Sequence, residues 1–382
     1  MNVLILSSWY PSCQNTISGV FVREQAKALI KVGINVTVFF PYDSSIKKSL
    51  LEKNYEDGIL TYRANTDYLK NSKLSRINSI FKAIKILKKI TAENNVHMIH
   101  SHVCYPSGFV AAFYKKYYKM PYVITEHMSY IKSYAARAYN YKLFNFSYSF
   151  ADRVIPVSKF LCNELTQLGF KFHGEVIGNV IDMPNVNISN KTKENNNFNI
   201  IFVGLMDKTE IKGLQYFIPA LSNLIKNNPQ FLIKVTFAGD GEKRNDYEKL
   251  CVELGIEENC NFLGLVHKKD ITALITQHDF LVLPSMKETF GSVLIEAMCC
   301  GKPVLSTKCG GPEEFVNEKT GILVEPGDIG ELEHGILSMI HNYSKFDFDY
   351  IRKYAEDNFS YEAVGRRLQT IYTEVLRNDG EL

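Results

Sequence analysis

The sequence predicts two doubly wound α/β domains in tandem, and three observations support this expectation. The chain has 382 residues, which is enough for two or three domains of about 150 residues each. Short runs rich in β-branched residues alternate with longer segments of helical period, the pattern of parallel sheets covered by helices on both faces. A polar stretch at 183–197 has no apolar periodicity and predicts a linker between the domains.

The first half, 1–182, begins with an apolar run that no basic residue precedes, so it predicts a strand and not a signal peptide. The expected strands of this half are 2–7, 35–40, 97–101, 122–126 and 153–157. The helical segments between them are 20–32, 76–93, 106–118 and 136–150. Each is long enough to cross from one parallel strand to the next.

The second half, 198–360, repeats this alternation. Its expected strands are 199–203, 232–238, 260–263, 279–283 and 303–306, and its expected helices are 213–227, 243–254, 269–276 and 292–300. A last helical segment lies within 361–382, and the sequence leaves open whether it packs back on the first domain. Ligands bind such sheets at the carboxyl ends of the strands, so we expect the site in a cleft between two facing domains.

Composition excludes several functional classes. Lys and Arg total 44 against 41 Asp and Glu, and the net charge of +3 gives no overall attraction to nucleic acid. No apolar run approaches the roughly 20 residues that span a bilayer. The eight cysteines include no Cys-x-x-Cys pair, and without an export signal they indicate reduced thiols in a cytoplasmic protein.

A strand followed by a glycine-containing helix start carries the most informative residues. Glu288 precedes the helix, and the main-chain N–H groups of Phe290, Gly291 and Ser292 at its start predict an anion site. Glu296 lies one turn inside the helix, so the two carboxylates are displaced along one surface and suit neighbouring hydroxyls of a polyol. For an isolated segment, a helix-start charge and a solvated glutamate would explain the same residues.

This segment resembles the Glu-x7-Glu signature of the retaining GT-B glycosyltransferases, which use nucleotide sugars. Further matches follow in the family's order along most of the chain: Gly19, Ile124–His127, Asn179–Asp182, Phe202–Gly204, Lys212–Gly213, Gly239–Gly241, Phe262–Gly264 and Gly310–Glu313. The resemblance implies the GT-B fold, with two Rossmann-like domains facing across a cleft.

The resemblance also implies roles for individual residues. Glu296 would bind the ribose hydroxyls, Glu288 would hold the donor sugar with the amides of 290–292, and Lys212 would neutralise the leaving diphosphate. His127 would hydrogen-bond the donor sugar from the first domain, and Gly19 would present its N–H near the phosphates. The expected catalytic residues are thus His127, Lys212 and Glu288. The other expected donor-binding residues are Gly19, Gly204, Leu265, Val266, Thr289, Phe290, Gly291, Ser292 and Glu296.

One position departs from the family pattern. The family usually has an arginine directly after the glycine that corresponds to Gly204, and this chain has Leu205. Lys212, main-chain amides or Lys208 would then have to hold the phosphates. Asp347-Phe-Asp349 resembles a metal motif of another glycosyltransferase fold, but it lies away from any strand end. We therefore expect a metal-independent reaction without a resident cofactor, and a UDP- or GDP-linked sugar as co-substrate.

The acceptor side is less defined. Residues 105–148 hold ten of the 22 tyrosines, interleaved with basic residues, and 80–90 forms a lysine-rich amphipathic helix. They suggest a path for a glycan or polyprenyl-linked saccharide acceptor and association with an anionic membrane surface. Lysines that face water on an ordinary surface helix would give the same pattern. With the resemblance, this predicts a retaining transferase of bacterial surface polysaccharide synthesis, such as capsule or O-antigen.

Three alternatives stay open at this point. A nucleotide-sugar epimerase shares the fold, but it needs acid and base residues for proton removal at the sugar. A dehydrogenase is suggested only by Gly239-Asp-Gly241, where the third fingerprint position is Arg244 and not glycine. A non-catalytic sugar-nucleotide-binding protein would be separated from an enzyme only by an activity assay.

Overall fold

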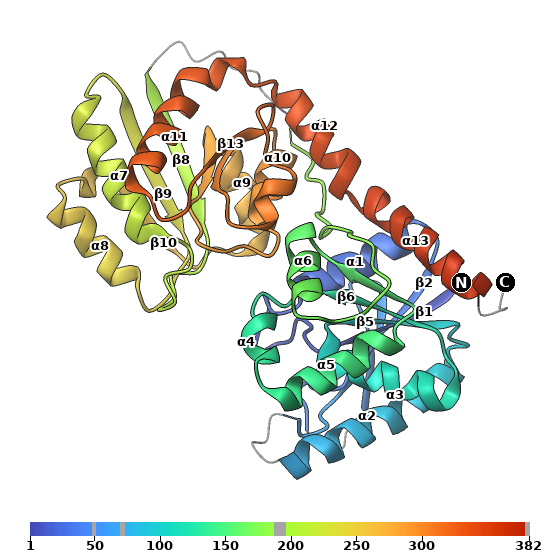
Figure 1. Ribbon diagram of the computed structural model, residues 1–382. Helices are drawn as coiled ribbons and strands as arrows, with labels where there is room; N and C mark the ends of the chain where they lie inside the picture. Colours follow the sequence, from blue (N-terminus) through green and yellow to red (C-terminus); the bar gives the residue numbers. More distant parts are fainter. Residues whose placement is uncertain (48–50, 69–72, 187–195, 379–382) are drawn as a thin grey trace. The chain divides into compact units, whose positions relative to one another are not determined.

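The computed structural model describes residues 1–47, 51–68, 73–186 and 196–378. The chain divides into two compact units. The first comprises Met1–Asp182 with Phe359–Leu382, and the second comprises Met183–Asn358. Each unit is a largely parallel sheet covered by helices (Figure 1). Most of the expected linker, 187–195, lies outside the described residues.

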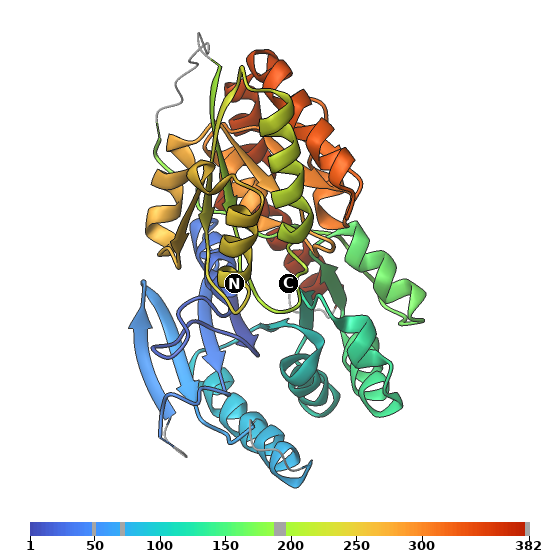
Figure 2. The ribbon, with the colours of Figure 1, turned by 90° about the vertical axis from the view of Figure 1, so that its left-hand side faces the viewer.

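The first unit contains a seven-stranded sheet in the order β3-β4-β2-β1-β5-β6-β7. Its strands are β1 (Asn2–Ser7), β2 (Asn35–Phe40), β3 (Leu51–Glu56), β4 (Ile59–Ala64), β5 (Met98–His102), β6 (Tyr122–Glu126) and β7 (Arg153–Pro156). All neighbours run parallel except β3, which pairs antiparallel with β4 at the sheet edge (Figure 2). The five expected strands are present, and the hairpin of β3 and β4 is an addition. Asp57 and Gly58, both at positive φ, form its turn, and an Asp-Gly dipeptide is the sequence signal for it.

The α-helices described in this unit flank the sheet. They are α1 (Val20–Lys31), α2 (Lys73–Glu93), α3 (Phe109–Tyr118), α4 (Ile131–Ala135), α5 (Ala138–Phe150), α6 (Lys159–Gln167) and α13 (Tyr361–Asn378), and a π-helical turn occupies Cys104–Gly108. Helices α1 and α13 cover one face of the sheet, and α2, α3 and α5 cover the other (Figure 1). The sequence did not predict α4 or α6.

The last helix, α13, packs on α1 and completes a core of the first unit. Its apolar stripe, which includes Val364, Leu368 and Val375, is buried against β1 and α1 residues. The helices approach closely at Gly365, where an added Cβ would lie 2.5 Å from the Ala28 carbonyl oxygen. The segment that the sequence left unassigned therefore belongs to the first unit.

The second unit contains a six-stranded parallel sheet in the order β10-β9-β8-β11-β12-β13. The strands are β8 (Asn197–Val203), β9 (Leu232–Ala238), β10 (Cys260–Gly264), β11 (Phe280–Leu283), β12 (Val304–Thr307) and β13 (Gly321–Val324). The helices are α7 (Leu214–Asn227), α8 (Arg244–Glu253), α9 (Lys268–Gln277), α10 (Ser292–Cys299), α11 (Ile329–Asn342) and α12 (Phe348–Phe359). Short 3₁₀ turns lie at Glu257–Asn259, Gly311–Glu314 and Tyr343–Lys345. The sequence did not predict β13, α11 and α12.

The Asp-x-Asp segment has a local structural explanation. Asp347 precedes α12, and its carboxylate accepts a hydrogen bond from the Tyr350 main-chain N–H at 3.0 Å. This is the geometry of a helix N-cap. The motif therefore begins a helix and does not follow a strand end.

Candidate active site

The expected donor residues of the second unit gather at one edge of its sheet. Gly204 follows β8, Leu265 and Val266 follow β10, and Glu288 follows β11. These strands belong to the run β10-β9-β8-β11, so their carboxyl ends lie at the same edge. Leu205 and Leu265 are exposed there, at 48% and 67%. This edge is the candidate donor site.

A lysine–carboxylate pair occupies this edge. The Lys212 ammonium donates a hydrogen bond to Glu288 Oε1 over 2.6 Å. The Ser285 hydroxyl donates to the same oxygen over 2.7 Å. The Glu288 side chain is 12% exposed and that of Lys212 is 28% exposed, so the pair is only partly screened by water. The structure thus brings together two of the three expected catalytic residues, which lie 76 positions apart.

Main-chain contacts fix Glu288 in place. Its N–H donates to the Cys309 carbonyl over 2.9 Å, and its own carbonyl accepts from the Gly311 N–H over 2.9 Å. An added Cβ on Gly311 would lie 2.4 Å from Phe290 Cα. The Gly310 N–H in turn donates to the Glu313 carboxylate over 3.0 Å. Because Gly310 and Gly311 have no side chains, this loop can lie against the Glu288 segment and pair with it through backbone hydrogen bonds.

A second glycine contact positions Lys212. Gly213 has φ 73° at the start of α7, and an added Cβ would lie 1.9 Å from the Pro284 carbonyl oxygen. The Met286 N–H also donates to the Ile211 carbonyl over 2.7 Å. The loops after β8 and β11 are thus joined through their backbones, and only glycine fits at the point of approach.

Helix α10 begins beside this pair. Gly291 has φ 87° and precedes the first helical residue, Ser292. Thr289 and Phe290 are buried, at 8% and 5% exposure, and Glu296 is half-buried one turn into the helix. The positive end of the helix dipole therefore lies next to the Lys212–Glu288 pair, as an anion site requires.

In the first unit, the helix that begins at Gly19 packs against His127. Gly19 has φ 70° and begins α1, and an added Cβ would lie 2.2 Å from the Trp9 carbonyl oxygen. Two residues further on, the Phe21 ring packs on the His127 imidazole with centroids 4.2 Å apart. His127 follows β6, so His127 and the start of α1 at Gly19 both lie at the carboxyl edge of this sheet.

His127 is the outermost of three stacked histidines, named here the histidine stack: His100, His102 and His127. Ring centroids are 4.6 Å apart for the first pair and 5.2 Å apart for the second. His127 Nε2 is hydrogen-bonded to His102 Nδ1 at 3.0 Å. Burial lowers the pKa of His100 and of His127 to about 3 and that of His102 well below its usual value. All three imidazoles are therefore neutral at pH 7.

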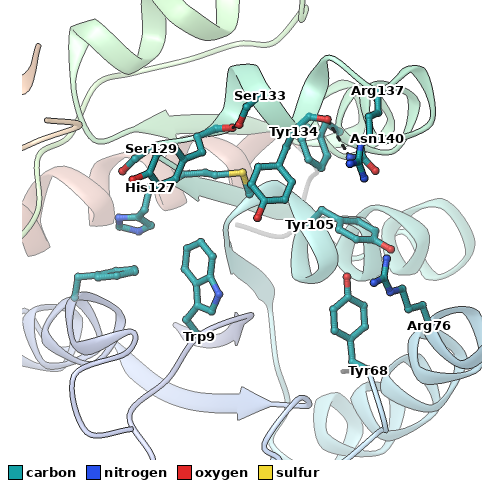
Figure 3. Close-up of a pocket in the computed structure, with 14 residues that line it drawn as sticks. Trp9, Tyr68, Arg76, Tyr105, His127, Ser129, Ser133, Tyr134, Arg137 and Asn140 are labelled. Atoms are coloured by element: carbon teal, nitrogen blue, oxygen red, sulfur yellow. Dashed lines mark hydrogen bonds between the residues drawn. The ribbon is translucent and has the colours of Figure 1, made fainter. Parts of the chain in front are cut away.

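A cavity of about 1060 Å³ opens beside His127 in the first unit (Figure 3). Its lining combines aromatic rings, hydroxyls and two arginines: Trp9, Phe21, Tyr68, Arg76, Tyr105, His127, Met128, Ser129, Tyr130, Ser133, Tyr134, Arg137, Asn140 and Phe144. No carboxylate is among these lining residues. The tyrosine-rich segment predicted part of this wall, but no sequence signal indicated Trp9, Tyr68 or Arg76, which come from distant parts of the chain.

Two further observations concern metals and membranes. Within the described ranges, no group of three or more His, Cys, Asp or Glu side chains is arranged to hold a metal ion. None of the helices described is long and apolar enough to cross a membrane.

Both halves of the chain match families of known proteins. Residues 18–183 match the family model described as Glycosyltransferase Family 4, and 185–357 match the one described as Glycosyl transferases group 1. With the two parallel-sheet units, these matches identify the chain as a GT-B glycosyltransferase that resembles family 4.

Individual proteins show the same similarity. An uncharacterized glycosyltransferase of Methanocaldococcus jannaschii is 28% identical, over 98% of this chain and 99% of its own length. The putative teichuronic acid biosynthesis glycosyltransferase TuaC of Bacillus subtilis is 26% identical, over 89% and 90%. The structure of HepE from Anabaena in complex with UDP has a TM-score of 0.76 at 22% identity, over 98% and 100% of the two chains. The last similarity concerns the fold alone.

Proposed function

We propose that this chain is a retaining glycosyltransferase that transfers a sugar from a UDP- or GDP-linked donor to a glycan or lipid-linked acceptor. The observation that carries the proposal is the Lys212–Glu288 pair, 2.6 Å apart beside the start of α10. A fixed cation, a carboxylate and a helix start are the groups that a diphosphate-linked sugar requires. HepE, which has the same fold, binds UDP.

Charge stabilisation is the main contribution proposed for the second unit. When the bond from the anomeric carbon to the diphosphate breaks, negative charge develops on the leaving phosphate. The Lys212 ammonium stabilises this charge, and Glu288, itself held by the Ser285 hydroxyl, fixes the ammonium in position. In the described residues, the hydrogen bonds of Glu288 with these two groups use Oε1. Its Oε2 can then accept from a sugar hydroxyl, while Glu296 binds the ribose.

We propose that the acceptor attacks the anomeric carbon on the same face from which the diphosphate departs. The acceptor oxygen forms the new bond to the anomeric carbon, the bond to the diphosphate breaks, and the acceptor proton passes to the leaving diphosphate. This step needs no protein base and no metal. His127 is compatible with such a step. Its lowered pKa keeps the imidazole neutral at pH 7, so that it is proposed to form a hydrogen bond with the donor sugar and not to act as a charged group. Gly19 is proposed to present its N–H to the phosphates.

The pathway assigned is bacterial surface polysaccharide synthesis. This part of the proposal is supported by the similarity to TuaC, whose name places it in teichuronic acid biosynthesis. The acceptor is assigned to the first unit, because the cavity of about 1060 Å³ there presents aromatic faces on which sugar rings pack.

The test begins with thermal unfolding of the full chain in the presence of nucleoside diphosphates and their sugars. We expect stabilisation by UDP or by GDP and not by both equally. With the matching nucleotide sugar and an acceptor, NMR of the product should show the anomeric configuration of the donor. Inversion of that configuration would refute a retaining reaction, and stabilisation by no nucleotide would refute the donor assignment. Full turnover of the donor without an acceptor would indicate an epimerase.

A further inference from the structure

An apolar groove adjoins the large cavity of the first unit. It measures about 190 Å³ and lies between α2, α3 and α5. Its apolar lining includes Ile77, Ile80, Phe81, Ile84, Phe109 and Phe113. Arg76 and Tyr105 line both the groove and the large cavity. The two spaces therefore meet at Arg76.

The groove leaves apolar side chains in contact with water. Ile77 is 46% exposed and Phe81 is 56% exposed, and the Phe81 ring meets that of Phe113 edge to face at 6.2 Å. Exposed apolar side chains that line a concave surface indicate a site for an apolar ligand. A groove of this volume with an apolar lining suits an unbranched or isoprenoid hydrocarbon chain.

The junction carries a positive charge. Arg76 is exposed, no ion pair links it to a carboxylate in the described part of the chain, and no Asp or Glu lines either space. Its guanidinium lies with the hydroxyl ends of Tyr68 and Tyr105 on one side of the cavity, and Trp9 and His127 lie on the other (Figure 3). A guanidinium beside hydroxyl donors matches the oxygens of a phosphate.

The polar cavity, the Arg76 cation and the apolar groove follow one another in space. A lipid-linked saccharide has its saccharide, phosphate and hydrocarbon chain in the same order. We propose that the acceptor is a saccharide joined through phosphate or diphosphate to an isoprenoid lipid. The saccharide lies in the large cavity toward His127, the phosphate binds Arg76, and the first segment of the hydrocarbon chain lies in the groove. This inference rests on the proposed function, because it names the acceptor of that same reaction.

The probe for this site is farnesyl diphosphate, titrated calorimetrically into the full chain beside farnesol and inorganic diphosphate. Farnesyl diphosphate should bind more tightly than either part alone. Arg76→Ala should weaken it about tenfold, the loss of one charge-assisted contact, and should not change farnesol binding. Phe81→Ser should weaken both prenyl compounds.

Matched controls are available on the same helix, α2. Lys85→Ala removes one positive charge and Leu74→Ser removes one exposed apolar side chain, and neither residue lines the cavity or the groove. Both variants should bind farnesyl diphosphate as the parent does. Because the probe contains a diphosphate, Lys212→Ala is also needed. Binding that disappears in this variant would assign the probe to the donor site and overturn the inference.

Other outcomes also decide the question. Equal binding in the parent and in Arg76→Ala would overturn the inference, as would diphosphate binding as tight as that of the prenyl compound. A third outcome would assign the face of α2 that carries Arg76 to membrane binding. In that case the chain binds phosphatidylglycerol vesicles but not farnesyl diphosphate, and Lys85→Ala weakens vesicle binding as much as Arg76→Ala does. UDP and GDP are titrated into the same samples. If the chain binds UDP or GDP but not farnesyl diphosphate, only the acceptor inference is rejected. If it binds neither nucleotide, the proposed function itself is rejected.

Discussion

Replacing either member of the Lys212–Glu288 pair should separate its structural role from its role toward the donor. In Lys212→Ala, Glu288 keeps its hydrogen bond from Ser285 but loses its cation. In Glu288→Gln, the shape and the Ser285 contact are conserved, and Lys212 loses its anion. The two variants should therefore both destabilise the fold, but only Lys212→Ala should weaken nucleotide binding.

The magnitudes follow from burial. Exposed ion pairs contribute about 0.2 to 1 kcal/mol, and breaking a buried pair costs about 3 to 5 kcal/mol. With side-chain exposures of 12% and 28%, this pair lies between these limits. We expect Lys212→Ala to lower the free energy of unfolding by about 1 to 2 kcal/mol, and Glu288→Gln to lower it less. In a double-mutant cycle the coupling energy should be about 1 kcal/mol.

Nucleotide binding should diverge. Lys212→Ala removes a phosphate contact and should weaken UDP or GDP binding about tenfold. Glu288→Gln removes the anion that competes for the lysine, so nucleotide affinity should hold or rise while transfer of the sugar falls. Urea unfolding and calorimetric titration measure the two effects. Lys353→Ala is the control, because it breaks the Lys353–Asp357 pair, also 2.6 Å apart in the second unit, and should leave both quantities unchanged.

One result would refute this reasoning directly. If Glu288→Gln weakens nucleotide binding as much as Lys212→Ala does, the lysine is not shared between the carboxylate and the phosphate. A coupling energy near zero would show that the 2.6 Å contact contributes nothing to stability.

Three further predictions concern the fold. Gly213→Ala should lower the free energy of unfolding by about 2 kcal/mol or more and weaken nucleotide binding, because its Cβ would meet a carbonyl oxygen at the end of β11. Arg63→Met should cost about 3 to 5 kcal/mol, since it leaves the buried Asp43 carboxylate, 2.6 Å from the guanidinium, without a cation; the exposed Arg366→Met is its control. The free energy of unfolding should fall as the pH is lowered from about 7.5 to about 5.5, and less steeply in His127→Gln.

The pH dependence has a definite sign. Each member of the histidine stack has a pKa near 3 or well below 6.5 in the folded chain, against 6.5 in the unfolded chain. Below pH 6.5 the unfolded chain therefore binds more protons, and stability is lost as the pH falls toward 3, by up to about 1.4 kcal/mol per pH unit for each histidine. An unchanged slope in His127→Gln would contradict the neutral state assigned to it. For Gly213→Ala and Arg63→Met, a loss in the free energy of unfolding smaller than that of a variant at an exposed position would contradict the packing argument.

The sequence predicted the sheets better than the segments around them. Ten expected strands correspond to ten strands of the structure, because buried parallel strands are short apolar runs that stand out from their neighbours. The hairpin of β3 and β4 was not predicted, since β3 is largely exposed and lacks a clear apolar alternation. Helices α11 and α12 come after the last expected strand, where the alternation of strands and helices that the sequence prediction followed has ended.

The sequence by itself determined which residues follow the ends of which strands, because strand, turn and helix signals are local. Together with the resemblance to the GT-B glycosyltransferases, this local pattern was enough to predict Lys212, Glu288 and the helix start of α10 as parts of one donor site. Only the tertiary structure decided which of these residues touch. The 2.6 Å contact of Lys212 with Glu288 depends on the strand order β8-β11 and on the close approach at Gly213.

The acceptor side depended on the tertiary structure almost entirely. Arg76 lies on α2, and Tyr105 belongs to the tyrosine-rich segment that the sequence singled out, but nothing in either local pattern relates the two residues. They line one cavity because α2 packs beside α3 on one face of the sheet. The position of α13 was likewise undecided until its apolar stripe was seen to pack on α1. Local periodicity specifies elements, whereas contacts between distant elements arise from the burial of their apolar faces together.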